Sequence, residues 1–218
     1  MSDINLNWLI DNFSNKHAVI YDIGCADIMT DANQFKELVS NSIVYAFECA
    51  EHWKMYNTLM ADKLGIHYYH IAMAGHNDGV TFYPSEKNHE QDWPWSGSIF
   101  TPDDHLVNAG LTFGETYSVP SITLTEFCKD HPVPNFIHID AQGAEYTIFK
   151  DMQIRPDVIW AEISAFHLYD TNVTYKQFDE MMKSHGYSQE YLSDQDALYI
   201  LTPSNFTSYP DSTKYSHE

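Results

Sequence analysis

Basic residues are scarce in this chain of 218 residues. Only 11 lysines and arginines stand against 31 aspartates and glutamates, so the formal net charge is −20. Proteins that bind nucleic acid neutralise its phosphates with clustered lysine and arginine. This balance therefore disfavours nucleic acid as a partner, and solubility alone accounts for so acidic a surface.

Cysteine is also rare, and long apolar runs are missing. Cys25, Cys49 and Cys128 contain no CxxC pair, so the sequence indicates neither a disulfide framework nor a zinc knuckle and favours a reducing cytoplasm. No stretch approaches the roughly 18 apolar residues of a membrane-spanning helix. The N-terminus carries no basic segment followed by an apolar one, so export and membrane binding are both disfavoured.

The chain does contain ample material for a core, because 44% of its residues are hydrophobic and 15% are aromatic. Its length fits a single domain over residues 1–218 with one insertion. Stretches typical of strands alternate with stretches typical of helices from residue 18 to about residue 72, which predicts right-handed crossovers and a parallel sheet. Four apolar residues of the helix that begins near Glu51 are expected to face the core: Trp53, Tyr56, Leu59 and Met60.

Acidic residues end several of the predicted strands. The run 18–21 leads into Asp22 and Gly24, and the run 43–47 ends at Glu48. Ligands of open α/β sheets bind beyond the carboxyl ends of the strands, so we expect these residues at the rim of a nucleotide-type pocket. Glycine allows the backbone to approach a ligand closely, and a carboxylate can accept the hydrogens of ribose hydroxyls.

Two later strands repeat this pattern. The run 135–139 ends at Asp140, and the run 156–161 ends near Glu162, with His167 close behind. A third strand is predicted over 66–72, and the segments 187–192 and 197–202 read as an antiparallel pair that closes the sheet.

Residues 75–120 lose this regularity and are interpreted as a β-rich insertion that covers the acceptor pocket. Trp93 and Trp95 within it either present apolar faces to a sugar or other ring, or anchor the loop to the core.

The succession of these motifs resembles the FkbM family of S-adenosylmethionine-dependent methyltransferases over about residues 17–200. It includes Tyr21-Asp22-Ile23-Gly24, the strand ending at Glu48, the run Asp140-Ala141-Gln142-Gly143-Ala144-Glu145 and the strand ending at Glu162. The resemblance implies a Rossmann-like class I methyltransferase fold with a seven-stranded, mostly parallel sheet and an antiparallel C-terminal strand pair. It further implies methyl transfer from S-adenosylmethionine to a hydroxyl of a small molecule or carbohydrate.

The same resemblance implies roles for individual residues. Asp22 and Gly24, with Cys25 beside them, are expected along the methionine part of the cofactor, and Glu48 at its ribose. Ala72 and Met73 are expected at the adenine, and Asp140 at the reacting centre. The implied acceptor is a small molecule or a sugar, and the oligomeric state is left open.

Three positions depart from the family pattern. Ile28 stands where a second glycine is usual, His138 where a lysine is usual, and Gln142 where a glutamate is usual. These departures indicate either a different acceptor or an inactive relative, so a catalytically silent cofactor-binding or scaffold protein is one alternative. A nicotinamide-dependent oxidoreductase is another, against which the missing glycine-rich fingerprint and the closing antiparallel strands count.

Methyl transfer from a sulfonium requires in-line placement of the acceptor oxygen and a route for its proton. Asp140, His138 and His167 are the candidate catalytic residues, either histidine as the base and Asp140 as base or orienting group. A divalent metal held by Asp140, Glu162 and His167 is a minor option that the spacing does not indicate.

Overall fold

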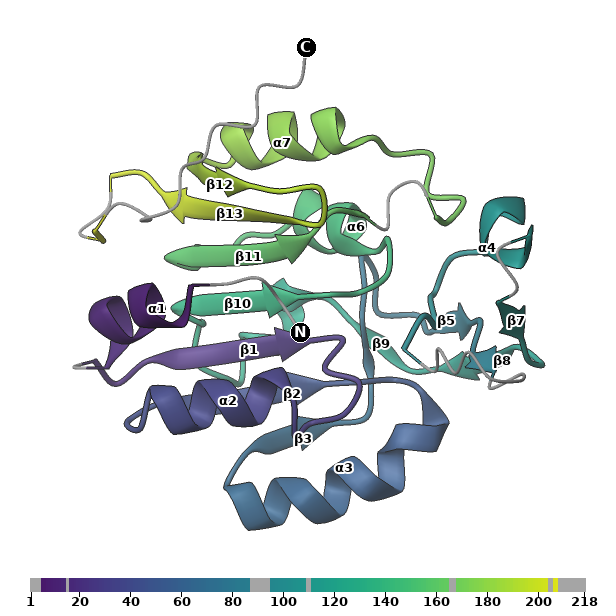
Figure 1. Cartoon of the computed structure of the whole chain (residues 1–218), viewed down its shortest axis with the longest axis horizontal. Helices are drawn as coiled ribbons and strands as arrows, with labels where there is room; N and C mark the ends of the chain where they lie inside the picture. The colour runs from purple at the N-terminus through teal and green to yellow at the C-terminus, as the bar shows by residue number, and fades with distance from the viewer. Residues whose placement is uncertain are drawn as a thin grey trace.

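The computed structural model describes residues 5–14, 16–86, 95–108, 111–164, 168–203 and 206–207. A seven-stranded sheet forms the centre of the molecule (Figure 1). From one edge to the other, its strands are β12 (Tyr187–Leu192), β13 (Asp196–Leu201), β11 (Val158–Glu162), β10 (Phe136–Ile139), β1 (Val19–Ile23), β2 (Ile43–Phe47) and β3 (His67–Tyr69).

Parallel pairing extends from β11 through β10, β1 and β2 to β3, and only β13 and β12 run antiparallel to their neighbours. The register places Ile23 at the end of β1 opposite both Ile139 and Phe47. The carboxyl ends of β1, β2 and β10 therefore lie side by side. The expected class I methyltransferase fold, a mostly parallel sheet closed by an antiparallel C-terminal pair, is confirmed.

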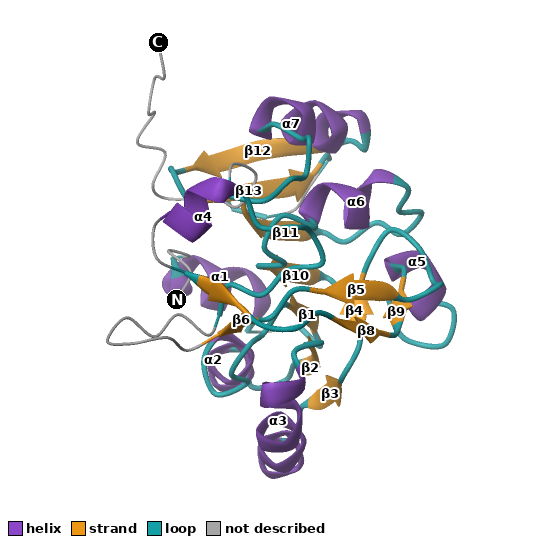
Figure 2. Cartoon of the chain, turned by 90° about the vertical axis from the view of Figure 1, so that its right-hand side faces the viewer, coloured by secondary structure: helices purple, strands orange, loops and turns teal. Residues whose placement is uncertain are grey.

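Helices cover both faces of the sheet (Figures 1 and 2). Adjacent residues of β1 show why, since Ile20 packs into one buried apolar cluster and Tyr21 into the other, as the alternation of a strand requires. The helices on the side of Ile20 are α1 (Leu6–Phe13), α2 (Asp31–Leu38) and α3 (Glu51–Leu64), and those on the side of Tyr21 are α5 (Leu124–Phe127), α6 (Glu145–Lys150) and α7 (Tyr175–Ser184).

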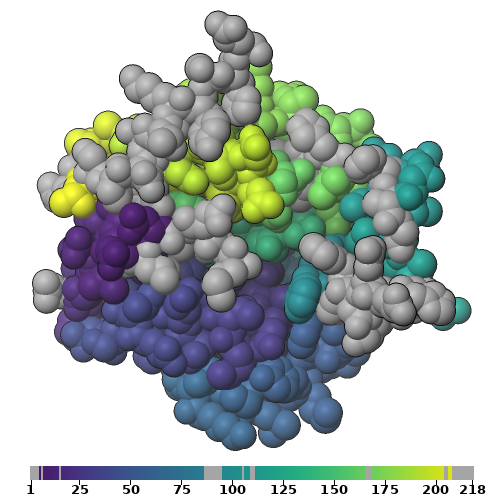
Figure 3. All heavy atoms as spheres, in the orientation of Figure 1, coloured from purple at the N-terminus to yellow at the C-terminus, as the bar shows by residue number. Residues whose placement is uncertain are grey.

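The two ends of the described chain meet on the surface. Figure 3 shows the purple N-terminal helix beside the yellow C-terminal hairpin. The indole Nε1 of Trp8 donates to the carbonyl of Thr207 at 2.8 Å, and Phe206 packs against Phe13. No helix within the described ranges is long and apolar enough to cross a membrane.

Helix α3 buries only part of the stripe that its sequence predicts. Trp53 and Met60 are partly buried and pack against the core clusters, but Tyr56 and Leu59 are 40% and 58% exposed. The prediction was wrong for these two because the helix rests on the sheet through the buried Asn57 and Ala61, and hydrophobic periodicity cannot identify a face that contains a polar residue. The predicted third strand was also too long, because after β3 the chain leaves the main sheet and Ala72 pairs with Ser121 instead.

The segment between β3 and α5 forms small strand pairs at one end of the sheet (Figure 1). Ser98, whose backbone bridges to Tyr83, lies in this segment, whereas Trp93 lies outside the described residues. Its elements are β4 (Ala72–Met73), β5 (Val80–Phe82), β6 (Ser85–Glu86), α4 (Asp104–Asn108), β7 (Thr112–Phe113), β8 (Tyr117–Val119) and β9 (Ser121–Ile122).

Candidate active site

A cavity of about 690 Å³ lies beyond the carboxyl ends of the parallel strands. Gly24, Glu48, Asp140 and Glu162, which follow or end four different strands, contribute to its lining. The residues between β4 and β9 line it as well, and so does the turn between β12 and β13. Acidic strand ends that are far apart in the sequence thus border one space.

Gly24 allows β1 and β10 to approach each other at the floor of this cavity. Its φ of +79° is in the left-handed region, and a Cβ built there would overlap the carbonyl oxygen of Asp140. The amide of Asp140 in turn donates to the carbonyl of Ile23 at 2.9 Å. Any side chain at position 24 would therefore separate the two strand ends, since the position is both strained and sterically filled.

The loop after Gly24 is held by a buried side chain of α3. The Asn57 amide donates to the carbonyl of Ala26 at 2.6 Å and accepts from the amide of Ile28 at 3.2 Å. Ala26 has a φ of +43°, and the Ile28 side chain is fully buried in the core beneath the loop. Ile28 thus serves as an apolar anchor where the family usually has a glycine. The sequence analysis missed Asn57, and no motif marks it.

Glu48 is fixed by backbone amides at the end of β2. The amide of Ala26 donates to its Oε2 at 3.0 Å, and the amide of Ala50 donates to its Oε1 at 2.7 Å. Burial raises the pKa of Glu48, and these amide bonds offset part of that rise. The backbone of Cys49 also hydrogen-bonds this carboxylate, and because its two oxygens can together accept four hydrogen bonds, acceptor capacity remains for a ligand hydroxyl.

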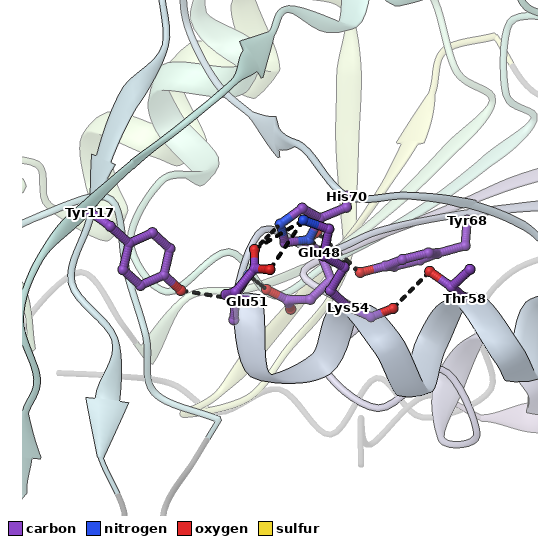
Figure 4. Close-up of polar contacts among 8 residues, drawn as sticks. Glu48, Glu51, Lys54, Thr58, Tyr68, His70 and Tyr117 are labelled. Atoms are coloured by element: carbon purple, nitrogen blue, oxygen red, sulfur yellow. Dashed lines mark hydrogen bonds and ion pairs between the residues drawn. The ribbon is translucent and has the colours of Figure 1, made fainter.

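Figure 4 shows the polar residues that surround Glu48 at the start of α3. The Tyr68 hydroxyl lies 3.4 Å from the carbonyl of Glu48, and the amide of Glu51 donates to the Tyr117 hydroxyl at 2.9 Å. Glu51 forms ion pairs with Lys54 and His70, but its side chain is 62% exposed. The two glutamates therefore differ in kind, since Glu48 borders the cavity and Glu51 belongs to a solvated surface network.

His138 forms a buried ion pair with Asp22 between neighbouring strands. The two side chains meet at 2.7 Å, and the imidazole packs edge-on against Phe35 of α2. Burial lowers the pKa of His138, but the hydrogen bond and charge of Asp22 outweigh this and raise it to about 9. His138 is therefore protonated at neutral pH.

This pair changes the expected position of Asp22. Its side chain is fully buried and is not among the described residues that line the cavity, whereas His138 is. Only Oδ1 of Asp22 is bound by His138, and Oδ2 is buried without a hydrogen-bond partner among the described residues. The contact between Asp22 and the cofactor that the resemblance implied stays a prediction, and sequence spacing alone gives no sign of the pairing with His138.

Asp140 and Glu162 are linked by the side chain that departs from the family pattern. The Gln142 amide nitrogen donates to Asp140 Oδ1 at 2.5 Å and to Glu162 Oε2 at 3.0 Å. The Tyr169 hydroxyl, which donates to the carbonyl of Ser96 at 2.6 Å, lies 3.1 Å from the Gln142 amide oxygen. Burial and the neighbouring Glu162 raise the pKa of Asp140 well above its ordinary value. Burial raises the pKa of Glu162 as well.

The remaining predicted residues are placed as follows. Cys25, Ala72 and Met73 line the cavity on the same side as Glu48. His167 lies outside the described residues, so its expected catalytic role and its part in a metal site stay predictions. No cluster of three potential metal ligands occurs in the described part of the chain.

Residues 17–188 match the family model described as the Methyltransferase FkbM domain. The chain belongs to the FkbM methyltransferase family. It is accordingly an S-adenosylmethionine-dependent methyltransferase.

Several solved structures are similar to this FkbM domain. One is an FkbM methyltransferase from Methylobacillus flagellatus KT, with 9% identity and a TM-score of 0.46. The match covers 84% of this chain and 43% of that chain. Another is TrmK of M. capricolum in complex with S-adenosylhomocysteine, with 16% identity and a TM-score of 0.44. The match covers 92% of this chain and 67% of that chain.

A third is a precorrin-6y C5,15-methyltransferase from Geobacter metallireducens GS-15, with 11% identity and a TM-score of 0.43. The match covers 89% of this chain and 82% of that chain. This chain thus spans less than half of the M. flagellatus protein. A comparison with curated proteins gives no match.

The residues of this FkbM domain fit the family's cofactor. The cavity is within the range of about 300–1,000 Å³ that is usual for small-molecule sites. Glu48 keeps acceptor positions for ribose hydroxyls, and Ile71, Ala72 and Met73 offer an apolar border for a base. The fit thus rests on the acceptor atoms of the Glu48 carboxylate and on the apolar side chains beside it.

Proposed function

We propose that this FkbM methyltransferase transfers a methyl group to a hydroxyl oxygen of a small molecule or sugar. The carrying observation is the pair Asp140 and Glu162, which lines the cavity and is bridged by the amide nitrogen of Gln142. A hydroxyl acceptor must lose a proton when it is methylated, and a carboxylate with a raised pKa is suited to accept it near neutral pH.

The cofactor side of the cavity supplies binding and orientation. Glu48 would hold the ribose, Gly24 and Cys25 would border the methionine part, and Ala72 and Met73 the adenine. S-adenosylmethionine supplies an electrophilic methyl group on a sulfonium. The preorganised loop, held by Asn57, fixes the cofactor side so that the acceptor oxygen can be placed in line.

Asp140 is a better candidate base than His138. A base must be unprotonated when the acceptor arrives, and His138, with a pKa of about 9, carries a proton and has Nδ1 bound to Asp22. Its positive charge instead favours the ionised form of Asp140, whose pKa it lowers. His138 therefore acts as a positioning group that supports the carboxylate.

The proposal is tested by incubating the protein with cofactor labelled in the methyl group and a panel of hydroxylated compounds. Mass spectrometry of the products locates the label, which we expect on oxygen. Label on nitrogen or carbon contradicts the proposal. Calorimetry with S-adenosylmethionine distinguishes a scaffold protein from an enzyme or a silent cofactor-binding protein. If no heat of binding is observed, both the enzyme and the cofactor-binding interpretation are excluded. Cytoplasmic location belongs to the same proposal and is supported by the cysteine pattern. The spacing of ligands does not indicate a divalent metal, and its requirement is left open.

A further inference from the structure

Trp95 lines the cavity and is 52% exposed, although tryptophan is highly buried on average in folded proteins. The sequence is compatible with two roles for this residue, an anchor for the insertion or an apolar face for a ligand ring. An anchor would bury its ring in the core. A half-exposed tryptophan at the border of a cavity instead offers a flat apolar surface to a ligand.

Hydrogen bonds connect the segment of this tryptophan to the proposed reacting centre. The Tyr169 hydroxyl donates to the carbonyl of Ser96, the next residue, at 2.6 Å. Ser98 Oγ donates to the carbonyl of Gln142 at 2.7 Å, and the Gln142 side chain donates to Asp140. This segment of the insertion is therefore held beside the carboxylate that is proposed to accept the proton.

The wall next to this segment is aliphatic and is formed by Leu106, Leu111 and Leu168, which all line the cavity. These leucines belong to a cluster with Tyr169, the residue that binds Ser96. A sugar carries hydroxyls around its whole edge, and a hydroxyl placed against leucine loses water without gaining a hydrogen bond. A planar apolar ring avoids this cost and can also stack on an indole.

Side-chain donors at this end of the cavity are already bound within the protein. Gln142 donates to both Asp140 and Glu162. Ser164 Oγ also donates to Glu162, and Ser98 Oγ donates to a backbone carbonyl. A polyol needs several partners around its edge, whereas a ring with one hydroxyl needs only the carboxylate that takes its proton.

The proposed base favours a hydroxyl that is attached directly to an aromatic ring. A phenol has a pKa of about 10, as tyrosine does, whereas an aliphatic hydroxyl is closer to water, whose pKa is about 15.7. Because a carboxylate is a weak base, transfer of the proton to Asp140 is much less unfavourable from a phenol than from an aliphatic alcohol.

We propose that the acceptor is a phenol, with its aromatic ring against Trp95 and the three leucines and its hydroxyl at Asp140. This inference rests on the proposed function and adds the substrate class. The phenolic oxygen forms a bond to the methyl carbon of S-adenosylmethionine while the bond between that carbon and sulfur breaks. The phenolic proton passes to Asp140, and S-adenosylhomocysteine is the second product.

Two matched sets of compounds test the preference for an aromatic ring. One pairs 2-naphthol with decahydro-2-naphthol, and the other compares phenol with cyclohexanol and myo-inositol. Each compound is titrated by calorimetry into protein saturated with S-adenosylhomocysteine. In at least one set, we expect the phenol to bind at least about fivefold more tightly than its saturated analogue, and myo-inositol to give no heat. A smaller preference in both sets overturns the proposal, and so does binding of myo-inositol or failure of both phenols to bind.

Two substitutions of Trp95 test its assigned contact. Trp95→Leu keeps an apolar side chain but removes the ring, so the preference for 2-naphthol over decahydro-2-naphthol should be lost and the KM for 2-naphthol should rise, with kcat changing far less. Trp95→Phe keeps a ring and should retain most of the preference. Tyr56→Ala is the matched control because it removes an exposed ring that is not among the described residues of the lining. Unchanged affinity for S-adenosylhomocysteine shows that each variant is folded, and a wild-type preference in folded Trp95→Leu contradicts the assignment.

The outcomes also separate this inference from the function on which it rests. If the wild-type protein does not bind S-adenosylhomocysteine, the proposed function fails. If it binds S-adenosylhomocysteine and methylates sugars or saturated alcohols in preference to phenols, the methyltransferase proposal stands and only the phenol proposal fails.

Discussion

The two ends of the cavity are built in different ways. At the cofactor end, backbone groups of consecutive strand ends bind one another, as when the amides of Gly24 and Cys25 both donate to the carbonyl of Phe47. At the acceptor end, side chains from distant segments form the hydrogen bonds that hold the elements together. Ser98 Oγ donates to the carbonyl of Gln142, and the Tyr169 hydroxyl donates to the carbonyl of Ser96.

This difference suits the two ligands. In the proposed function, the cofactor is held by the strand ends of the common fold and the acceptor by an insertion and by side-chain contacts, both of which can change without disturbing the sheet. The predictions below test whether the two ends are separable in function.

The largest effect is expected for Asp140→Asn, which removes the proposed base at the acceptor end. The substitution keeps the size of the side chain but removes its ability to accept a proton, so kcat should fall by about 10²- to 10⁴-fold. Steady-state assays with labelled cofactor measure this, and calorimetry checks that cofactor affinity changes far less. Asp151→Asn, an exposed change at the end of α6, is the control. A variant that keeps more than a tenth of wild-type kcat contradicts the assignment.

The pair beneath both ends, His138 and Asp22, is expected to make stability depend on pH. Because the pKa of His138 is raised to about 9 in the folded protein, its contribution is complete below about pH 6.5 and is lost as the pH rises through 9. The lost free energy of unfolding is about 3 kcal/mol. Glu145, whose burial raises its pKa to about 8, acts in the same direction.

Urea unfolding at pH 6.5, 8 and 9.5 measures this slope in the wild type and in His138→Gln. The variant should be less stable at pH 6.5, and its stability should decline less toward pH 9.5 because the contribution of His138 is then absent. If the free energy of unfolding falls equally with pH in the two proteins, His138 is not protonated in the folded state.

The sequence predicted the sheet well because its strands are apolar runs that end in acidic residues. It also indicated that Glu48, Asp140 and Glu162 share one edge, since parallel strands place their carboxyl ends together. It did not indicate that Asp22 is covered by His138, because pairing between β1 and β10 depends on a register that only the folded sheet fixes.

Two further features were beyond the reach of sequence patterns. Asn57 is a polar residue in a helix whose predicted apolar stripe is exposed at Tyr56 and Leu59, so periodicity does not point to the face that Asn57 shares. Gln142 was marked as a departure from the family, but its role as a bridge depends on side-chain distances to Asp140 and Glu162. Long-range side-chain contacts of this kind leave no periodic signal.

A smaller effect, confined to the cofactor end, is expected for Glu48→Ala. Loss of its charged hydrogen bonds should weaken cofactor binding by about 1–3 kcal/mol, and calorimetry with S-adenosylmethionine measures this. Glu51→Ala is the matched control, three residues along the chain and 62% exposed. If both variants bind the cofactor like the wild type, Glu48 does not hold the ribose. A change in preference among acceptors would show that the two ends are coupled.

The smallest effect is expected for Asn57→Ala, which removes the side chain that clamps the loop after β1. The carbonyl of Ala26 and the amide of Ile28 then lose their partners, so cofactor affinity should fall by about 1–2 kcal/mol because the loop is no longer held in its binding conformation. Thr58→Ala, which removes a solvent-exposed hydroxyl on the same helix, should leave it unchanged. A purely structural role lowers the midpoint of thermal unfolding but leaves the affinity of the remaining folded protein intact. Calorimetry well below that midpoint therefore decides whether Asn57 positions the cofactor loop or only stabilises the fold.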